Sequence, residues 1–173
     1  MFSKKNKQQT RRLSSGGLID RSKPISFKFD GKPLMGYVGD TLASALLANN
    51  VKLVGRSFKY HRPRGIYTAG TEEPNALVAL RTNARTEPNT RATNIELFDG
   101  LEAKSQNRWP NLFLDFMQIN NLAGPFFTAG FYYKTFMGIP GWHFYEHFIR
   151  KAAGMGSTNL ERDPDTYDKK NAF

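Results

Sequence analysis

The stretch from Arg56 to Gly65, read as RSFKYHRPRG, holds the residue types best suited to chemistry. Cations interleaved with aromatic rings can contact phosphates and stack on bases. The same side chains could bind a cofactor phosphate or an acidic partner surface, and a solvated basic loop would need no function. From residue chemistry alone, this stretch predicts a basic, partner-binding domain.

Two other motifs have weaker support. His143–His147 matches the H-x-x-E-H pattern of zinc hydrolases, in which two imidazoles on one helix face hold a metal. It lies among aromatics that favour a packed helix, and His61 sits in a basic stretch that would repel a cation, so no metal site is expected. Gly154–Gly156 begins like a dinucleotide fingerprint, but Asn159 stands at the place of the last glycine and no strand precedes it, which favours a helix terminus.

Composition narrows the class of protein. Of the net charge of +10 on 173 residues, residues 1–23 carry +6, so most of the basicity lies in a Lys-, Gln-, Ser- and Gly-rich arm. Apolar runs are only a few residues long, and the basic N-terminus is not followed by a secretory apolar stretch, so no membrane partner is expected. Cysteine is absent, which excludes disulfides and thiolate ligands and is typical of a reducing, cytoplasmic location.

The expected elements form one compact α+β unit. Alternating polarity predicts a strand at Ile25–Phe29, Asp30-Gly31 predicts a hairpin turn, and Asp40 or Thr41 can cap a helix. The further strands are expected at Lys32–Val38, Ala76–Arg81 and Thr93–Phe98. This order predicts a β-grasp sheet lying across one helix.

Beyond Asp99 the sequence becomes rich in aromatic residues and is broken by glycine and proline. Short helices and loops are expected there, with Trp142–Ala153 the most regular. So many aromatics should pack against something large. The predicted organisation is a basic flexible arm at 1–22, a β-grasp domain at 23–98, an aromatic-rich, mostly helical or irregular extension at 99–156, and a linker at 157–173.

Several sequence blocks, taken together, resemble the N-terminal region of heterotetrameric sarcosine oxidase alpha subunits. They cover roughly residues 16–156 in family order, which makes the resemblance more specific than any single motif. The blocks are Gly39–Asn49, Gly55–Gly65, Glu72–Leu77, Glu87–Thr93, Ser105–Pro110 and Ala129–Phe136.

The resemblance implies a plant-type ferredoxin domain, whose cluster loop has the pattern C-x4-C-x2-C after an Arg-Gly pair. Placed on Arg64-Gly65, this pattern puts Thr68, Glu73 and Ala76 at the ligand positions, and none of them is a thiolate. Related cyanide-forming, proline and opine dehydrogenases keep cysteines in this loop. The domain is therefore expected to be a ferredoxin scaffold that kept its loop and lost its cluster, with no metal and no cofactor of its own.

For the whole enzyme, the resemblance implies a flavin-dependent oxidoreductase that converts sarcosine to glycine, with methylene-tetrahydrofolate or formaldehyde and hydrogen peroxide as products. FAD, FMN, NAD and tetrahydrofolate are the implied cofactors, with zinc in another subunit. The implied partners are the rest of the alpha subunit, including a dinucleotide-binding domain, and the beta, gamma and delta subunits. This segment is expected to be inactive alone and to contain no catalytic residue.

The resemblance also implies a place for the loop, on the FMN side of the enzyme or at a subunit interface. The alternatives are a small basic nucleic-acid-binding protein, which the resemblance does not favour, and a stand-alone assembly module. The candidate binding residues are Arg56, Lys59, Tyr60, Arg62, Arg64, Thr68, Glu73 and Asn75.

Overall fold

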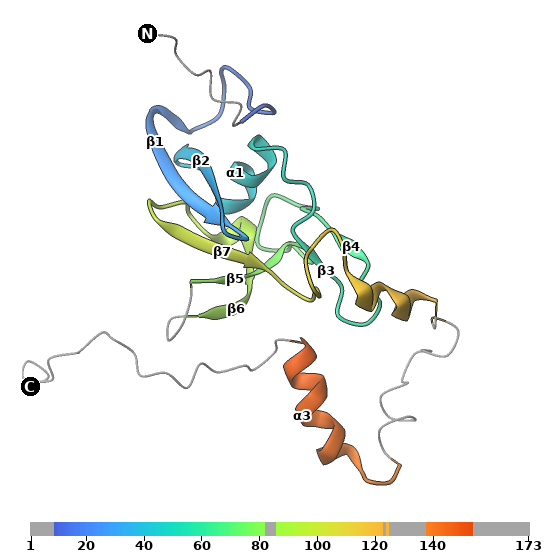
Figure 1. Cartoon of the computed structure of the whole chain (residues 1–173). Helices are drawn as coiled ribbons and strands as arrows, with labels where there is room; N and C mark the ends of the chain where they lie inside the picture. Colours follow the sequence, from blue (N-terminus) through green and yellow to red (C-terminus); the bar gives the residue numbers. More distant parts are fainter. Residues whose placement is uncertain (1–8, 82–85, 123, 125–137, 154–173) are drawn as a thin grey trace, which may run out of the picture.

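The computed structural model describes residues 9–81, 86–122, 124 and 138–153, and its centre is a five-stranded mixed sheet. The strand order is β2-β1-β7-β5-β6, and a separate two-stranded ladder joins β3 to β4 (Figure 1). The strands are β1 Asp20–Phe29, β2 Lys32–Val38, β3 Gly55–Arg56, β4 Pro63–Arg64, β5 Leu77–Leu80, β6 Glu87–Arg91 and β7 Leu101–Ser105. The helices are α1 Leu42–Ala48, the 3-10 turns η2 Ala92–Asn94 and η3 Phe116–Asn121, and α3 Trp142–Ala153. A mixed sheet with few helices confirms the predicted α+β class.

The first hairpin follows directly from its sequence. Asp30 and Gly31 have φ values of 49° and 76°, the left-handed pair that a type I′ turn requires. Strand β1 then pairs antiparallel with β2, from Phe29 opposite Lys32 outward. The alternation in β1 is also as expected, since Ile25, Phe27 and Phe29 are buried while the residues between them are exposed.

Helix α1 begins at a reciprocal cap and supplies the other side of the core. The Thr41 hydroxyl accepts from the Ser44 backbone N–H at 3.2 Å, and the Ser44 hydroxyl accepts from the Thr41 N–H at 3.0 Å. Asn50, just past the C-cap Asn49, has a φ of 61°, in the left-handed region. The buried helix residues Leu42, Ala45 and Leu46 pack into one cluster with the apolar face of the sheet.

One predicted strand is wrong. Thr93–Phe98 is not a strand of the sheet: it begins in η2 and makes a single bridge, between Glu96 and Thr41. Ile95 and Leu97 are buried as their alternation suggests. Their backbones, however, bond to the start of α1 and the turn before it: Leu42 N–H donates to Ile95 O at 2.8 Å, and Leu97 N–H donates to Asp40 O at 2.8 Å.

The strand that completes the sheet is β7, in the part of the chain expected to belong to the extension. It runs parallel to β1 and antiparallel to β5, so it joins the two hairpins (Figure 1). Asp30 holds its end, accepting from the Ser105 N–H at 2.9 Å and from the Arg108 guanidinium at 3.0 Å. The sheet domain therefore extends past Phe98.

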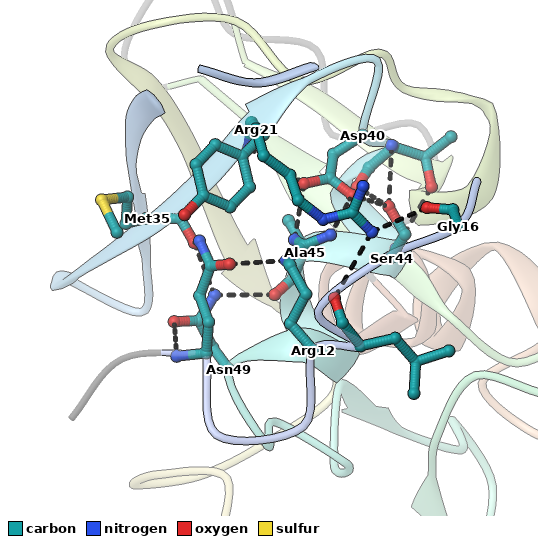
Figure 2. Close-up of polar contacts among 12 residues, drawn as sticks. Arg12, Gly16, Arg21, Met35, Asp40, Ser44, Ala45 and Asn49 are labelled. Atoms are coloured by element: carbon teal, nitrogen blue, oxygen red, sulfur yellow. Dashed lines mark hydrogen bonds and ion pairs between the residues drawn. The ribbon is translucent and has the colours of Figure 1, made fainter. Parts of the chain in front are cut away.

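The basic arm is anchored from Gln9 onward. Arg12 donates to both carboxylate oxygens of the buried Asp40, at 3.1 and 2.6 Å (Figure 2). The Gln9 side chain donates to Met35 O at 2.8 Å, and the Arg11 N–H to Ala48 O at 3.0 Å. These contacts belong to residues within the arm predicted at 1–22, and β1 begins at Asp20, also inside that range.

The helix expected at Trp142–Ala153 is present as α3. In the part of the chain that the structure describes, no helix is both long enough and apolar enough to cross a membrane. Residues 1–8, the block Ala129–Phe136, the Gly154–Gly156 motif and the linker at 157–173 lie outside the described residues.

Candidate functional site: the loop from Arg56 to Ala76

The loop begins with a tight hairpin between β3 and β4. Ser57 N–H donates to Arg62 O at 2.9 Å, and His61 N–H donates to Ser57 O at 3.0 Å, with His61 at a φ of 53°. The chain then runs through residues 65–76 into β5. This path brings all eight predicted binding residues into one loop region.

Arg56 is turned into the protein. Its guanidinium donates to Leu112 O at 2.8 Å and to His61 O at 2.8 Å, and its Nε lies 3.5 Å from the Asp115 carboxylate. The side chain is only 4% exposed. Arg56 therefore ties the loop to the segment that follows β7.

Asp115 is the centre of this connection, and the sequence offered no signal for it. His61 Nδ1 lies 2.7 Å from Asp115 Oδ2, and because a carboxylate only accepts, the imidazole donates. The other carboxylate oxygen accepts from the Trp109 and Met117 backbone N–H groups at 3.0 and 3.2 Å. Residue types alone could not have paired Asp115 with His61, since 54 positions separate them.

Two of the remaining cations of the loop, the half-buried Lys59 and the exposed Arg62, lie beside an aromatic ring. Lys59 Nζ is 4.9 Å and the Arg62 guanidinium 4.6 Å from the centroid of Tyr60. Arg62 also donates to Asn121 Oδ1 at 3.2 Å, and Arg64 donates to the side chain of Asn75. Cation–aromatic stacking of this kind presents positive charge on a semi-rigid platform.

Glu73 is the most buried ionisable residue of the loop, with an exposed fraction of 0%. Its Oε2 accepts from the Tyr67 and Thr68 N–H groups at 2.8 and 2.6 Å. Its Oε1 accepts from the Asn75 and Ala76 N–H groups at 2.7 and 3.0 Å. Burial would raise the pKa of Glu73, but the four backbone donors outweigh it and hold that pKa below its ordinary value.

The ligand positions predicted from the spacing do come together. Thr68 and Ala76 lie on either side of the Glu73 carboxylate, each donating its backbone N–H to it. From outside the loop, the Thr93 hydroxyl donates to Gly70 O at 2.8 Å and Arg91 Nε to Glu73 O at 3.0 Å. The sequence placed Glu73 at this loop, whereas its role as a buried acceptor could be found only from the structure.

In the described part of the chain, no group of three or more His, Cys, Asp or Glu side chains is arranged so that it could hold a metal ion. In the H-x-x-E-H motif on α3, His143 Nδ1 lies 3.7 Å from Glu146 and its side chain is 98% exposed. His147 instead packs edge-on against the Phe148 ring.

The β-grasp sheet and the loop between β3 and β5 define a ferredoxin-like domain. The chain belongs to the 2Fe-2S iron-sulfur cluster binding domain family, whose model matches residues 22–108.

Among curated proteins, the chain is 62% identical over 160 residues to the sarcosine oxidase subunit alpha of Rhizobium meliloti (strain 1021), a match that covers 91% of this chain and 16% of that protein. It is 40% identical over 93 residues to the sarcosine oxidase subunit alpha of Corynebacterium sp. (strain U-96), covering 52% of this chain and 10% of that one. The chain thus spans about a sixth or less of the length of these relatives. They support the predicted resemblance and give no support to a nucleic-acid-binding protein.

Among solved structures, the crystal structure of L-proline dehydrogenase from P. horikoshii matches with 31% identity and a TM-score of 0.40, over 50% of this chain and 16% of that one.

The residues of the loop do not fit the cluster that the family name implies. A [2Fe–2S] cluster of the plant type is held by cysteine thiolates, and this sequence has no cysteine. Thr68 and Ala76 offer no thiolate, and both oxygens of Glu73 already accept backbone hydrogen bonds. The donor set therefore excludes such a cluster in this loop.

Proposed function

We propose that this chain is the N-terminal, ferredoxin-like segment of a sarcosine oxidase alpha subunit. The observation that carries the proposal is the 62% identity to the Rhizobium meliloti subunit over 91% of the chain. The parent enzyme would be a cytoplasmic flavoprotein that oxidises sarcosine to glycine and hydrogen peroxide, passing the methyl carbon to tetrahydrofolate or releasing it as formaldehyde. FAD, FMN and NAD would be bound elsewhere in that enzyme, and zinc by another subunit.

The role proposed for this segment is assembly rather than catalysis. Its loop has no thiolate, so it cannot relay electrons through a cluster. A row of large apolar side chains on residues 109–122 is suited to burial against a partner, and we call this row the 109–122 surface. Its exposed members are Trp109, Phe113, Leu114, Phe116, Met117, Ile119 and Leu122.

The partners proposed for this surface are the rest of the alpha subunit and the beta, gamma and delta subunits. Exposed apolar area of this kind is typical of an interaction site. Residues 157–173 would lead into a dinucleotide-binding domain. The segment would have no enzymatic activity of its own.

The loop is proposed to lie at the FMN side of the enzyme or at a subunit interface. Lys59, Tyr60 and Arg62 form the stacked cationic platform described above, and Arg64 with Asn75 lies next to it. Such a platform suits a flavin phosphate or acidic groups of a partner. Arg56, Thr68 and Glu73 would support it from inside the loop.

The test is a double substitution, Arg62→Ala with Arg64→Ala, made in the complete enzyme. A cation at the surface contributes about 0–1 kcal/mol, whereas one buried beside its partner costs about 3–5 kcal/mol when that pair is broken. We expect a loss of subunit affinity or of FMN retention of about a hundredfold or more, measured by size-exclusion chromatography and flavin absorbance.

Lys104→Ala is the matched control, because Lys104 is an exposed cation on β7 outside the loop. It should leave assembly and sarcosine-dependent peroxide formation unchanged. If the double variant assembles with full flavin content and normal turnover, the platform is a solvated surface and its proposed role is wrong.

A further inference from the structure

The interior of the loop is an arrangement of backbone donors converging on one point. Four N–H groups, from Tyr67, Thr68, Asn75 and Ala76, meet at the Glu73 carboxylate within 2.6–3.0 Å. Successive backbone N–H groups that point into a concave loop make an anion-binding nest, and nests of this kind surround many phosphate and iron–sulfur sites. The loop is therefore built to hold negative charge.

The Glu73 carboxylate lies at one of the positions that the family pattern assigns to cluster ligands. The family's ligand spacing places ligands at Thr68, Glu73 and Ala76, and two of these residues donate their own N–H groups to the third. A thiolate-bound cluster is an anion whose sulfurs accept hydrogen bonds. The carboxylate lies among the same positions and accepts the same type of bond.

We propose that Glu73 is a built-in anion that takes the place of the cluster in the nest, and that the nest binds a small free carboxylate once Glu73→Ala has removed this side chain. The side chain keeps the loop closed without metal, because it supplies the charge and the acceptors that the backbone donors need. The ligand class of the vacated site is a one- or two-carbon carboxylate such as formate or acetate. This inference does not depend on which enzyme the segment serves.

Both carboxylate oxygens are needed, which separates this proposal from a simple requirement for a polar side chain. Each oxygen accepts from two N–H groups, so an amide in place of the carboxylate would point an NH2 group at two donors. Glu73→Gln is therefore expected to be destabilising although its shape is conserved. A buried donor without an acceptor costs about 1–3 kcal/mol.

The experiment is chemical rescue of Glu73→Ala in the full chain. Urea unfolding is measured in sodium formate and in sodium chloride at equal ionic strength. In chloride we expect the unfolding equilibrium constant to rise by tenfold or more, which corresponds to about 1.4 kcal/mol or more. Formate should restore a large part of this loss in the variant.

The controls are the native chain and Glu72→Ala, which removes the exposed neighbouring carboxylate. Both should respond equally to the two salts. Equal responses of Glu73→Ala to formate and chloride would overturn the proposal, as would native stability of Glu73→Gln.

A second measurement keeps the proposal open to refutation if Glu73→Ala does not fold. In the native chain, the amide protons of Tyr67, Thr68, Asn75 and Ala76 should exchange with solvent slowly, because all four are bonded to a buried carboxylate. Exchange at the rate of an open loop for these four amides would show that the nest is not closed by Glu73.

Discussion

Replacing Asp115 by asparagine should destabilise the chain strongly, although it changes the shape of the side chain very little. Asp115 is fully buried, lies 3.5 Å from Arg56 Nε and accepts from His61 at 2.7 Å. The variant leaves the Arg56 guanidinium buried without its counter-charge. Breaking one partner of a buried pair costs about 3–5 kcal/mol, and the retained amide oxygen places the expected loss near the lower end of this range.

The loss is measured as the change in free energy of unfolding in urea, followed by tryptophan fluorescence, because Trp109 donates its backbone N–H to Asp115 and so belongs to the same site. The matched control is Glu102→Gln, which neutralises a carboxylate whose partner Lys28 is 56% exposed. That change should leave the free energy of unfolding nearly unchanged, because an exposed ion pair contributes little. Should Asp115→Asn cost no more than Glu102→Gln, the reasoning that this site is a buried charge centre would be refuted.

Three further outcomes are expected. Gly36→Ala should destabilise the fold by about 1–3 kcal/mol through overpacking, because a Cβ there would lie 2.3 Å from the Leu97 side chain. Its control is Gly138→Ala, whose Cβ would meet no atom within 4 Å, so thermal melts should show nearly native stability for this variant. The pKa of Glu73 is lowered in the folded chain, so the ionised side chain stabilises the fold fully above the ordinary pKa of 4.5, and this stabilisation is lost as the pH falls through the folded pKa. The urea midpoint should therefore fall less steeply on acidification in Glu73→Gln than in the native chain. The isolated chain should bind a hydrophobic dye at the 109–122 surface, and serine in place of its exposed aromatics should reduce the fluorescence; unchanged fluorescence would place the dye elsewhere.

Local signals in the sequence were enough to predict the first half of the sheet. The alternation in Ile25–Phe29, the Asp30-Gly31 turn and the cap at Thr41 each depend on residues within a few positions of one another. Such short-range preferences act whatever the rest of the chain does. The sequence therefore predicted β2 with the observed limits and α1 with its observed start, whereas β1 begins at Asp20, five residues before the predicted strand.

The second half depends on partners that lie far away in sequence. Ile95 and Leu97 alternate with polar residues as strand residues do, and both are buried. Alternation predicts burial, but it does not predict which backbone segment will form the hydrogen bonds. Strand β6 was missed because EPNTR is polar and contains a proline, which is tolerated at a sheet edge. Strand β7 has small buried residues at Ala103 and Ser105, so its hydrophobic signal is weak although it is central.

The site was predictable only as far as its position in the chain. Spacing placed Thr68, Glu73 and Ala76 in one loop, and the structure brings them together. That Arg56 faces inward could not be read from the sequence, because all its acceptors except His61 O belong to residues 112–115, more than fifty positions further on.

The central place of β7 has a consequence for how the chain is made. Among the described strands, the β2–β1 hairpin and the β5–β6 hairpin are joined only through β7, whose Glu102 meets Lys28 from 74 positions earlier. An isolated two-stranded hairpin is at best marginally stable in water. On the ribosome, the first hairpin and α1 therefore cannot join a complete sheet, and keep part of their apolar surface uncovered, until residue 105 has emerged. The sheet then closes in one late step, and this interval is when a nascent chain of this kind most needs protection from aggregation.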